Sequence, residues 1–230
     1  MNQARLVTIH APHDPDGVVV VLHGGASREG NPMVSPAQLS VLRMIPVARR
    51  ISQTGRGRLA VFRLLNSTRG WDAHHTPVHD AAWALARVQE TYGERPVSLV
   101  GHSLGGRAAI LAGDQRGVVS IVALNPWVYG SDTGNLHGRP TLIVHGLDDR
   151  IASAEKSAAL ARRLAAHTEV GYIAIPGAKH AMLRHGRQFE TYAAQFAAAT
   201  LLGRDALRLS APVSAVLDGA ILDGAAFVDG

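Results

Sequence analysis

Cysteine is absent from this chain of 230 residues, and lysine is nearly absent. Without cysteine, the chain can form no disulfide, use no thiolate nucleophile and bind no metal through sulfur. Lys156 and Lys179 are the only lysines, so the formal charge of +5 comes almost entirely from arginine. The arginines are scattered and are not gathered with aromatic residues into a stripe, which argues against a nucleic-acid partner. A preference for anionic substrates stays open.

Long apolar runs are also missing. No run approaches the roughly 20 residues that a membrane span needs. The first residues lead into a strand-like segment and not into the apolar core of a signal peptide. We therefore expect a cytoplasmic protein with no stable membrane association. Apolar residues make up 47% of the chain, which argues against disorder and suits one α/β domain of this length.

Expected strands and helices alternate along the chain. This alternation predicts an α/β fold with a mostly parallel central sheet and helices on both faces. We expect one catalytic domain over 1–203 and an irregular C-terminal extension over 204–230, where small and apolar residues follow no clear period. The strands are expected at 5–10, 17–23, 58–65, 96–102, 118–124, 139–145 and 169–175, and the helices at 37–54, 76–92, 104–115, 153–167 and 184–202.

A Gly-x-Ser-x-Gly motif, Gly101-His102-Ser103-Leu104-Gly105, joins an expected strand to an expected helix. This context is typical of a nucleophile elbow, a sharp turn that lifts the serine hydroxyl clear of the sheet. Glycines are expected on either side because side chains there would collide with the neighbouring strand and helix. The helix directs its N-terminal amides toward the serine, where negative charge would develop. Ser103 is therefore the candidate nucleophile.

A serine hydroxyl needs a general base, and the base needs an acid that orients it. Both residue types follow expected strands further along the chain. Asp148 and Asp149 come after the strand at 139–145, and His180 comes after the strand at 169–175. Each would lie at the same edge of the sheet as Ser103, and the order Ser, Asp, His is the one expected after such an elbow.

On these motifs the chain resembles the α/β-hydrolase superfamily over residues 5–203, in its small esterase, lysophospholipase-like and dienelactone-hydrolase-like members without a large lid. The resemblance implies the α/β-hydrolase fold with no large cap domain. It places the acid at Asp149, the third residue after Gly146, with Asp148 as the alternative. It places the base at His180, which ends a Gly-x-x-His turn.

The resemblance also implies an oxyanion hole after the strand at 17–23. One amide would come from Leu104 and the other from Gly25, with Ala26 as the second choice. The alternative is that Gly24 and Gly25 only form a tight turn, with His23 holding the loop. Both roles are compatible.

The substrate pocket is harder to predict. Trp71 and Trp127 each follow an expected strand and could line an acyl or alcohol pocket, although a buried structural role suits them equally. Ala26 and His102 complete the predicted pocket, with His102 expected chiefly to pack within the elbow. The connection 125–138 is too short for a helical lid, so we expect an open cleft.

These residues predict a serine hydrolase that cleaves ester or thioester bonds of small to medium-sized molecules through an acyl-enzyme. The same catalytic residues also serve acyltransferases, thioesterases or cyclases and lyases, and a binding module without catalysis is a third class. No metal or organic cofactor is implied. His74, His75 and His79 are close in sequence, but Pro77 interrupts them and no carboxylate cluster completes a metal site.

Overall fold

The computed structural model describes residues 3–27, 32–219 and 226–229. The strands are β1 (Arg5–His10), β2 (Gly17–Leu22), β3 (Leu59–Leu65), β4 (Val97–His102), β5 (Val118–Leu124), β6 (Thr141–Gly146), β7 (Val170–Ile175) and β8 (Ala226–Asp229). The helices are α1 (Leu39–Leu42), α2 (Met44–Thr54), α3 (Thr76–Tyr92), α4 (Leu104–Leu111), α5 (Ala154–Leu164), α6 (Gly186–Leu202) and α7 (Ala211–Leu217), with a short 3-10 helix η1 (Arg204–Ala206).

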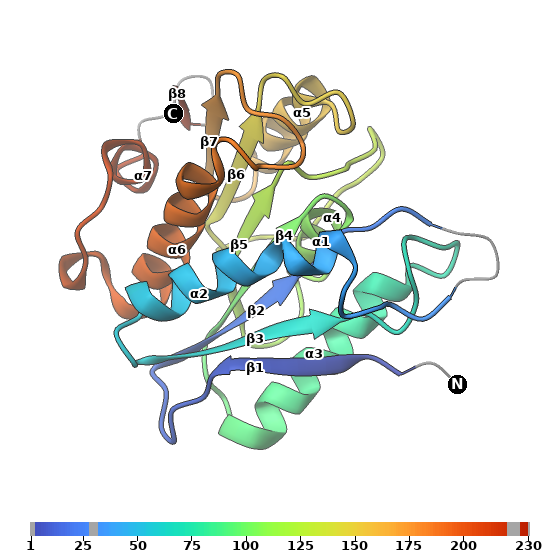
Figure 1. Cartoon of the computed structure of the whole chain (residues 1–230). Coiled ribbons are helices and arrows are strands. Elements are labelled where there is room, and N and C mark those ends of the chain that lie inside the picture. Colours follow the sequence, from blue (N-terminus) through green and yellow to red (C-terminus); the bar gives the residue numbers. More distant parts are fainter. Residues whose placement is uncertain (1–2, 28–31, 220–225, 230) are drawn as a thin grey trace.

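The strands form one sheet in the order β1-β3-β2-β4-β5-β6-β7-β8 (Figure 1). Strand β1 runs antiparallel to β3, and the other neighbouring strands are parallel. Each of the seven predicted strands is present, with ends shifted by at most two residues. The predicted mostly parallel α/β sheet is therefore confirmed.

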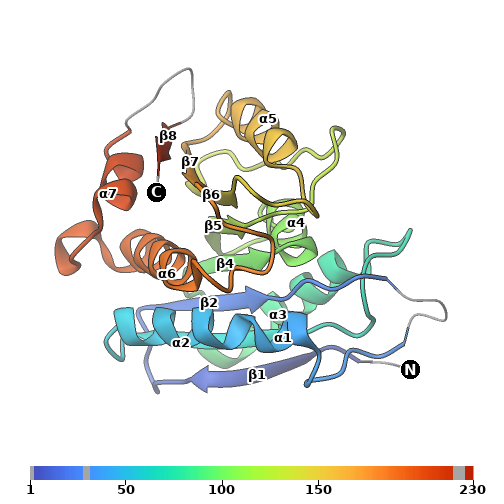
Figure 2. The ribbon, with the colours of Figure 1, turned by 45° about the horizontal axis from the view of Figure 1, so that its top comes forward.

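Helices cover both faces of the sheet, as Figures 1 and 2 show. Helices α2, α6 and α7 pack on one face, and α3, α4 and α5 pack on the other. Strand β2 has no exposed residue because both of its faces are covered. Its valines alternate between the two cores: Val19 and Val21 face α2 and α6, whereas Val18 and Val20 belong to the opposite core.

The single helix predicted over 37–54 is divided in the structure. Helix α1 ends at Leu42, and α2 begins at Met44. Pro46 has no amide hydrogen, so the Leu42 carbonyl cannot receive the bond that would continue one uninterrupted helix. The break lies at Arg43.

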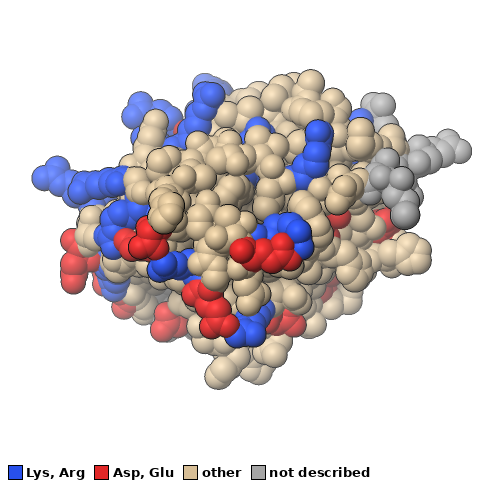
Figure 3. All heavy atoms as spheres, turned by 90° about the horizontal axis from the view of Figure 1, so that it is seen from below, with Lys and Arg blue, Asp and Glu red and all other residues tan. Residues whose placement is uncertain are grey.

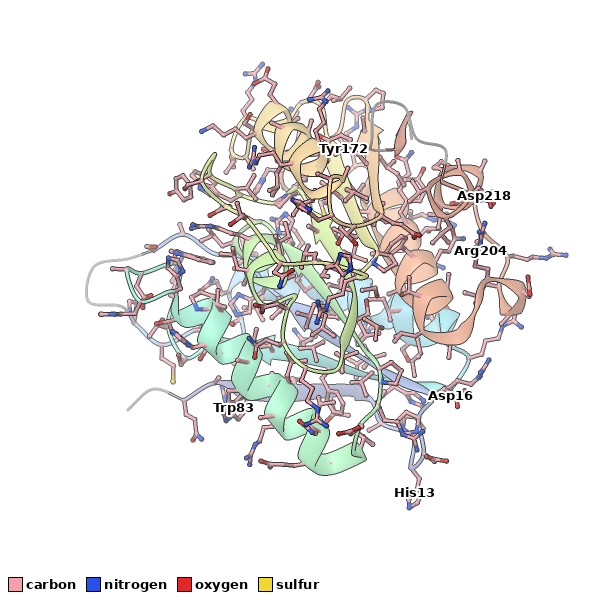
Figure 4. The ribbon with its side chains drawn as sticks, turned by 180° about the vertical axis from the view of Figure 1, so that it is seen from behind. His13, Asp16, Trp83, Tyr172, Arg204 and Asp218 are labelled. Carbon is pink, nitrogen blue, oxygen red and sulfur yellow. The ribbon has the colours of Figure 1, made fainter. Side chains whose placement is uncertain are left out.

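The prediction of an irregular extension after residue 203 is wrong for much of that segment. Helix α7 buries Val213 and Val216 in the same core as α6, and β8 pairs with β7. Val216 fits against Gly171 of β7, where any side chain would collide with it. Arg204 forms an ion pair with Asp218, which ties η1 to the end of α7 (Figure 4). Residues 220–225 and 230 lie outside the described part of the chain.

Charges of both signs are interspersed on the face seen from below in Figure 3. Surface ion pairs include Arg58 with Asp16 and Arg95 with Asp14. Exposed pairs of this kind contribute little to stability, about 0–1 kcal/mol each. Within the described ranges, no helix has the length and apolar character required to cross a membrane.

Candidate active site

Ser103 occupies a strained turn between β4 and α4. Its backbone has φ 57° and ψ −121°, a conformation that residues other than glycine rarely adopt. A side chain at Gly101 would collide with the Gly105 backbone, and one at Gly105 would collide with the Leu22 carbonyl of β2. The two glycines therefore allow the helix to start immediately behind the serine, as the motif predicts.

The structure brings Ser103, His180 and Asp149 into one hydrogen-bonded row. The Ser103 Oγ lies 3.0 Å from His180 Nε2, and His180 Nδ1 lies 2.7 Å from Asp149 Oδ2. The three residues follow β4, β7 and β6, so they meet where parallel strands end. The side chain of Asp149 is fully buried, whereas Asp148 is exposed. Asp149, not Asp148, makes the contact with His180.

Asp149 is held as a carboxylate. Its Oδ1 accepts hydrogen bonds from the amides of Ile151, at 2.8 Å, and Ala152, at 2.9 Å. Burial alone would raise the pKa of the Asp149 carboxyl, but hydrogen bonds from His145, His180 and the two amides lower it well below its ordinary value. An ionised Asp149 keeps the proton of His180 on Nδ1 and leaves Nε2 free to accept the hydroxyl proton of Ser103.

A second histidine, His145, lies against Asp149 and is not among the residues predicted from the sequence. Its Nε2 lies 3.4 Å from Asp149 Oδ2 and 3.2 Å from the Ala152 carbonyl, so Nε2 carries the hydrogen. Its Nδ1 lies 2.8 Å from Ser157 Oγ. His145 is fully buried near the end of β6, and it contacts the same carboxylate oxygen, Oδ2, as His180 does.

Asn125 joins the turn of Asp149 to the turn of His180, and it too was not predicted. Its Oδ1 accepts the amide of Gly146 at 2.8 Å, and its Nδ2 donates to the His180 carbonyl at 3.2 Å. Asn125 has φ 42°, a left-handed conformation that asparagine tolerates better than most residues. This buried side chain sets the positions of the Asp149 and His180 turns relative to each other.

His102 supports His180 from the elbow. Its Nε2 donates to the His180 carbonyl at 2.9 Å, and the two rings lie 4.9 Å apart. Complete burial lowers the pKa of His102 to about 3, so the ring is neutral at ordinary pH. The expected packing role of His102 fits this contact.

The loop after β2 lies directly beside the serine. A Cβ on Gly24 would lie 2.8 Å from Ser103 Cβ, and Gly25 has φ 145°, which few residues other than glycine adopt. His23 holds this loop, because its Nδ1–H donates to the Gly24 carbonyl at 2.6 Å and its Nε2 accepts the Asn66 amide at 3.2 Å. Burial lowers the pKa of His23, in accord with a neutral ring that can both donate and accept.

A pocket of about 450 Å³ opens in front of Ser103. Four residues named from the sequence as a possible pocket lie on its wall: Ala26, Trp71, His102 and Trp127. Gly25 and Leu104 line it as well. The segment 126–138 contains turns and no helix, so it forms no helical lid over the pocket. The remaining lining residues are Gly24, Ser27, Ser40, Arg43, Ser103, Tyr129, Ile151 and His180.

Arg107 of α4 braces one wall of this pocket and was not predicted. Its guanidinium lies between two aromatic rings, 4.1 Å from the centre of Trp71 and 4.5 Å from that of Tyr129. It also binds both oxygens of Asp132, at 2.7 and 2.8 Å, and both members of this ion pair are buried. Arg107 thus ties α4, the helix that follows Ser103, to the two loops that wall the pocket.

The histidines at 74, 75 and 79 do not assemble into a metal site. In the described part of the chain, no group of three or more histidine, aspartate or glutamate side chains is arranged to hold a metal ion. His75 instead lies against Trp71, with ring centres 5.3 Å apart. The hydrogen-bonded row beside Ser103 contains serine, histidine and a carboxylate, a set of groups suited to proton transfer.

Comparison with solved structures gives the fold. The chain is similar to a putative α/β hydrolase from Agrobacterium tumefaciens, with a TM-score of 0.66, 17% identity, and coverage of 90% of this chain and 94% of that one. It is also similar to an α/β serine hydrolase without a lid from Xanthomonas campestris, with a TM-score of 0.60, 15% identity, and coverage of 91% and 98%. An esterase from Pyrobaculum calidifontis gives a TM-score of 0.61, 16% identity, and coverage of 90% and 87%.

The chain has the α/β-hydrolase fold. No protein-family model and no curated protein matches the sequence, so the assignment rests on the shared structure. The resemblance seen in the sequence motifs is therefore confirmed at the level of the fold.

Proposed function

We propose that this protein is a serine hydrolase that cleaves ester or thioester bonds of small to medium-sized molecules. Ser103 is the nucleophile, His180 the general base and acid, and Asp149 the residue that orients His180. The observation that carries the proposal is the continuous row from Ser103 Oγ through His180 to Asp149 Oδ2, with contacts of 3.0 and 2.7 Å. Such a row on a strained elbow activates a hydroxyl that is otherwise a weak nucleophile.

The reaction proceeds in two halves. Ser103 Oγ attacks the substrate carbonyl while its proton passes to His180 Nε2, and a tetrahedral oxyanion forms. His180 then donates that proton to the leaving alcohol or thiol, and the acyl group stays on Ser103. Water attacks this acyl-enzyme, giving its proton to His180. The second tetrahedral intermediate collapses to the acid and restores the serine.

The oxyanion would be bound by the amides of Leu104 and Gly25. Leu104 is the first residue of α4, so its amide has no acceptor within the helix. Gly25 lies on the pocket wall beside Gly24, which abuts Ser103. A single donor in such a hole contributes about 3–4 kcal/mol to the transition state.

Turnover of p-nitrophenyl butyrate tests this proposal. Ser103→Ala should abolish turnover while the circular dichroism spectrum and melting temperature stay close to those of the parent protein. Ser35→Ala is the matched control, because Ser35 is exposed and does not line the pocket. Product analysis with and without an added alcohol separates hydrolysis from acyl transfer to that alcohol.

Two results would overturn the proposal. One is full activity in a folded Ser103→Ala protein, which would show that another group performs the attack. The other is no turnover of any ester or thioester in a panel of varied acyl and leaving groups by the folded parent protein.

A further inference from the structure

One arginine of the pocket, Arg43, has no hydrogen-bond or ion-pair partner for its side chain among the residues that the structure describes. Among the described residues that line the pocket, Arg43 is the one with a permanent charge, and none is acidic. Arg43 lies at the junction of α1 and α2, where its amide donates to the Leu39 carbonyl and holds the backbone in place. The side chain of Arg43 therefore extends to the pocket from a backbone that is held by a hydrogen bond.

The guanidinium of Arg43 forms no ion pair with any described residue, and its Nε is buried without a hydrogen bond. Burial lowers the pKa of Arg43, which reports the cost of removing this charge from water. Arg107, by contrast, which contacts two rings of the pocket wall, is neutralised by both oxygens of Asp132. Buried polar groups without a partner are uncommon, so Arg43 calls for an explanation.

A hydroxyl lies on the same side of the pocket. Ser40 precedes Arg43 by three residues and lines the pocket with it. The Ser40 Oγ accepts a hydrogen bond from Gln38 Nε2 at 2.6 Å, so its own hydrogen is available to a ligand. A guanidinium with a hydroxyl donor beside it matches the two acceptor oxygens of a carboxylate.

We propose that Arg43 and Ser40 form a subsite for a substrate carboxylate, so that the preferred ester carries a free carboxylate on its acyl or its alcohol part. This inference rests on the proposed function, because the carboxylate belongs to the ester that the proposed hydrolase cleaves. It adds a chemical class that neither the elbow nor the fold specifies, because both are compatible with neutral and charged esters.

Two matched pairs of esters test the subsite. In the first, p-nitrophenyl hemiadipate is compared with p-nitrophenyl methyl adipate, so the charge lies on the acyl part. In the second, 4-butyryloxybenzoate is compared with its methyl ester, so the charge lies on the alcohol part. In at least one pair, the charged ester should have a kcat/KM about ten- to a hundredfold higher than the neutral one, as expected for hydrogen bonds to a charged group.

The variants separate the subsite from a structural role. Arg43→Gln should remove the preference for the charged ester, Arg43→Lys should retain part of it, and Ser40→Ala should reduce it less. Arg49→Gln is the control, because Arg49 is an exposed arginine of α2, the helix that follows Arg43, and does not line the pocket. Equal kcat/KM for both members of both pairs, or a preference that survives Arg43→Gln, would overturn the subsite.

A binding measurement keeps this inference distinct from the proposed function. If the parent protein hydrolyses none of the four esters, the proposed function fails for them, but calorimetry with adipate and 4-butyryloxybenzoate still tests the subsite. Binding of either anion by the parent protein, weakened at least tenfold in Arg43→Gln, supports it. No binding of either anion, or equal binding by the two proteins, rejects it.

Discussion

Replacing Asp149 by asparagine should stop catalysis by reversing one hydrogen bond. The Oδ1 atom of Asp149 accepts the amides of Ile151 and Ala152 at 2.8 and 2.9 Å. An asparagine will keep its oxygen there, because its NH2 group cannot accept from two amides. The NH2 group then takes the place of Oδ2 and faces Nδ1 of His180, which lies 2.7 Å away.

Two donors cannot share one hydrogen bond, so His180 must present a bare Nδ1 and carry its hydrogen on Nε2. That tautomer cannot accept the hydroxyl proton of Ser103 across the 3.0 Å contact. The same substitution in a Ser-His-Asp protease lowers kcat about 10⁴-fold, which corresponds to about 5 kcal/mol of the barrier. We expect a loss of this size in kcat, with a much smaller change in KM.

Steady-state kinetics with p-nitrophenyl butyrate measure the effect, and a thermal melt establishes that the variant is folded. Asp148→Asn is the matched control, because it makes the same chemical change at the next residue, which is exposed. Its kcat should stay within about a factor of two. A folded Asp149→Asn protein that keeps more than a tenth of the parent kcat, or an equal loss of kcat in Asp148→Asn, would refute this role of Asp149.

Three further predictions concern stability, pH and substrate length. Asp132→Leu should lower the free energy of unfolding, measured in urea, by about 3–5 kcal/mol, because it leaves the buried Arg107 unpaired. Adding Arg107→Met to the same chain should restore much of that loss. The pKa of His102, lowered to about 3, means that below about pH 6.5 the unfolded chain binds a proton that the folded chain does not. The contribution of the neutral His102 ring to the free energy of unfolding is therefore complete above that pH. It is lost as pH falls from about 6.5 toward 3, by about 2 kcal/mol at pH 5. His102→Gln should not show this part of the loss. In a p-nitrophenyl series from acetate to palmitate, kcat/KM should peak at short or medium chains, because a pocket without a lid stops gaining about 0.8 kcal/mol per methylene once it is filled.

Each of these predictions has a contrary outcome. If the double variant is no more stable than Asp132→Leu alone, the two side chains are not energetically coupled. An equal loss of stability between pH 7.5 and 5 in the parent and in His102→Gln would show that other groups cause it. A kcat/KM that rises steadily to palmitate, or a jump in rate above the solubility limit of the substrate, would contradict the open pocket.

Local patterns in the sequence predicted much of the fold. Alternating apolar segments placed the parallel strands, and the glycines of the elbow predicted the close approach of α4 to β2 at Gly105. The predicted acid, base and nucleophile are brought within hydrogen-bond distance because each follows a parallel strand at the same edge. Their catalytic roles remain predictions.

The residues that hold the site together could not be predicted in this way. Asn125, His145 and Arg107 act on partners 21, 4 and 25 residues away, and no local period marks them. The packing of helix α7 could not be predicted from local patterns either. Val216 has one apolar neighbour at helical spacing, Val213, in the short helix α7, and its burial depends on the room that Gly171 leaves on another element.

The identity of the nucleophile is tested most directly by the mass of the protein after reaction with a fluorophosphonate. One probe molecule should attach per chain, and peptide mapping should place it on Ser103. Ser103→Ala should remain unlabelled, and Ser35→Ala should be labelled like the parent protein. A folded parent protein that takes up no probe, or carries it on another residue, would contradict the central claim that Ser103 is activated by His180 and Asp149.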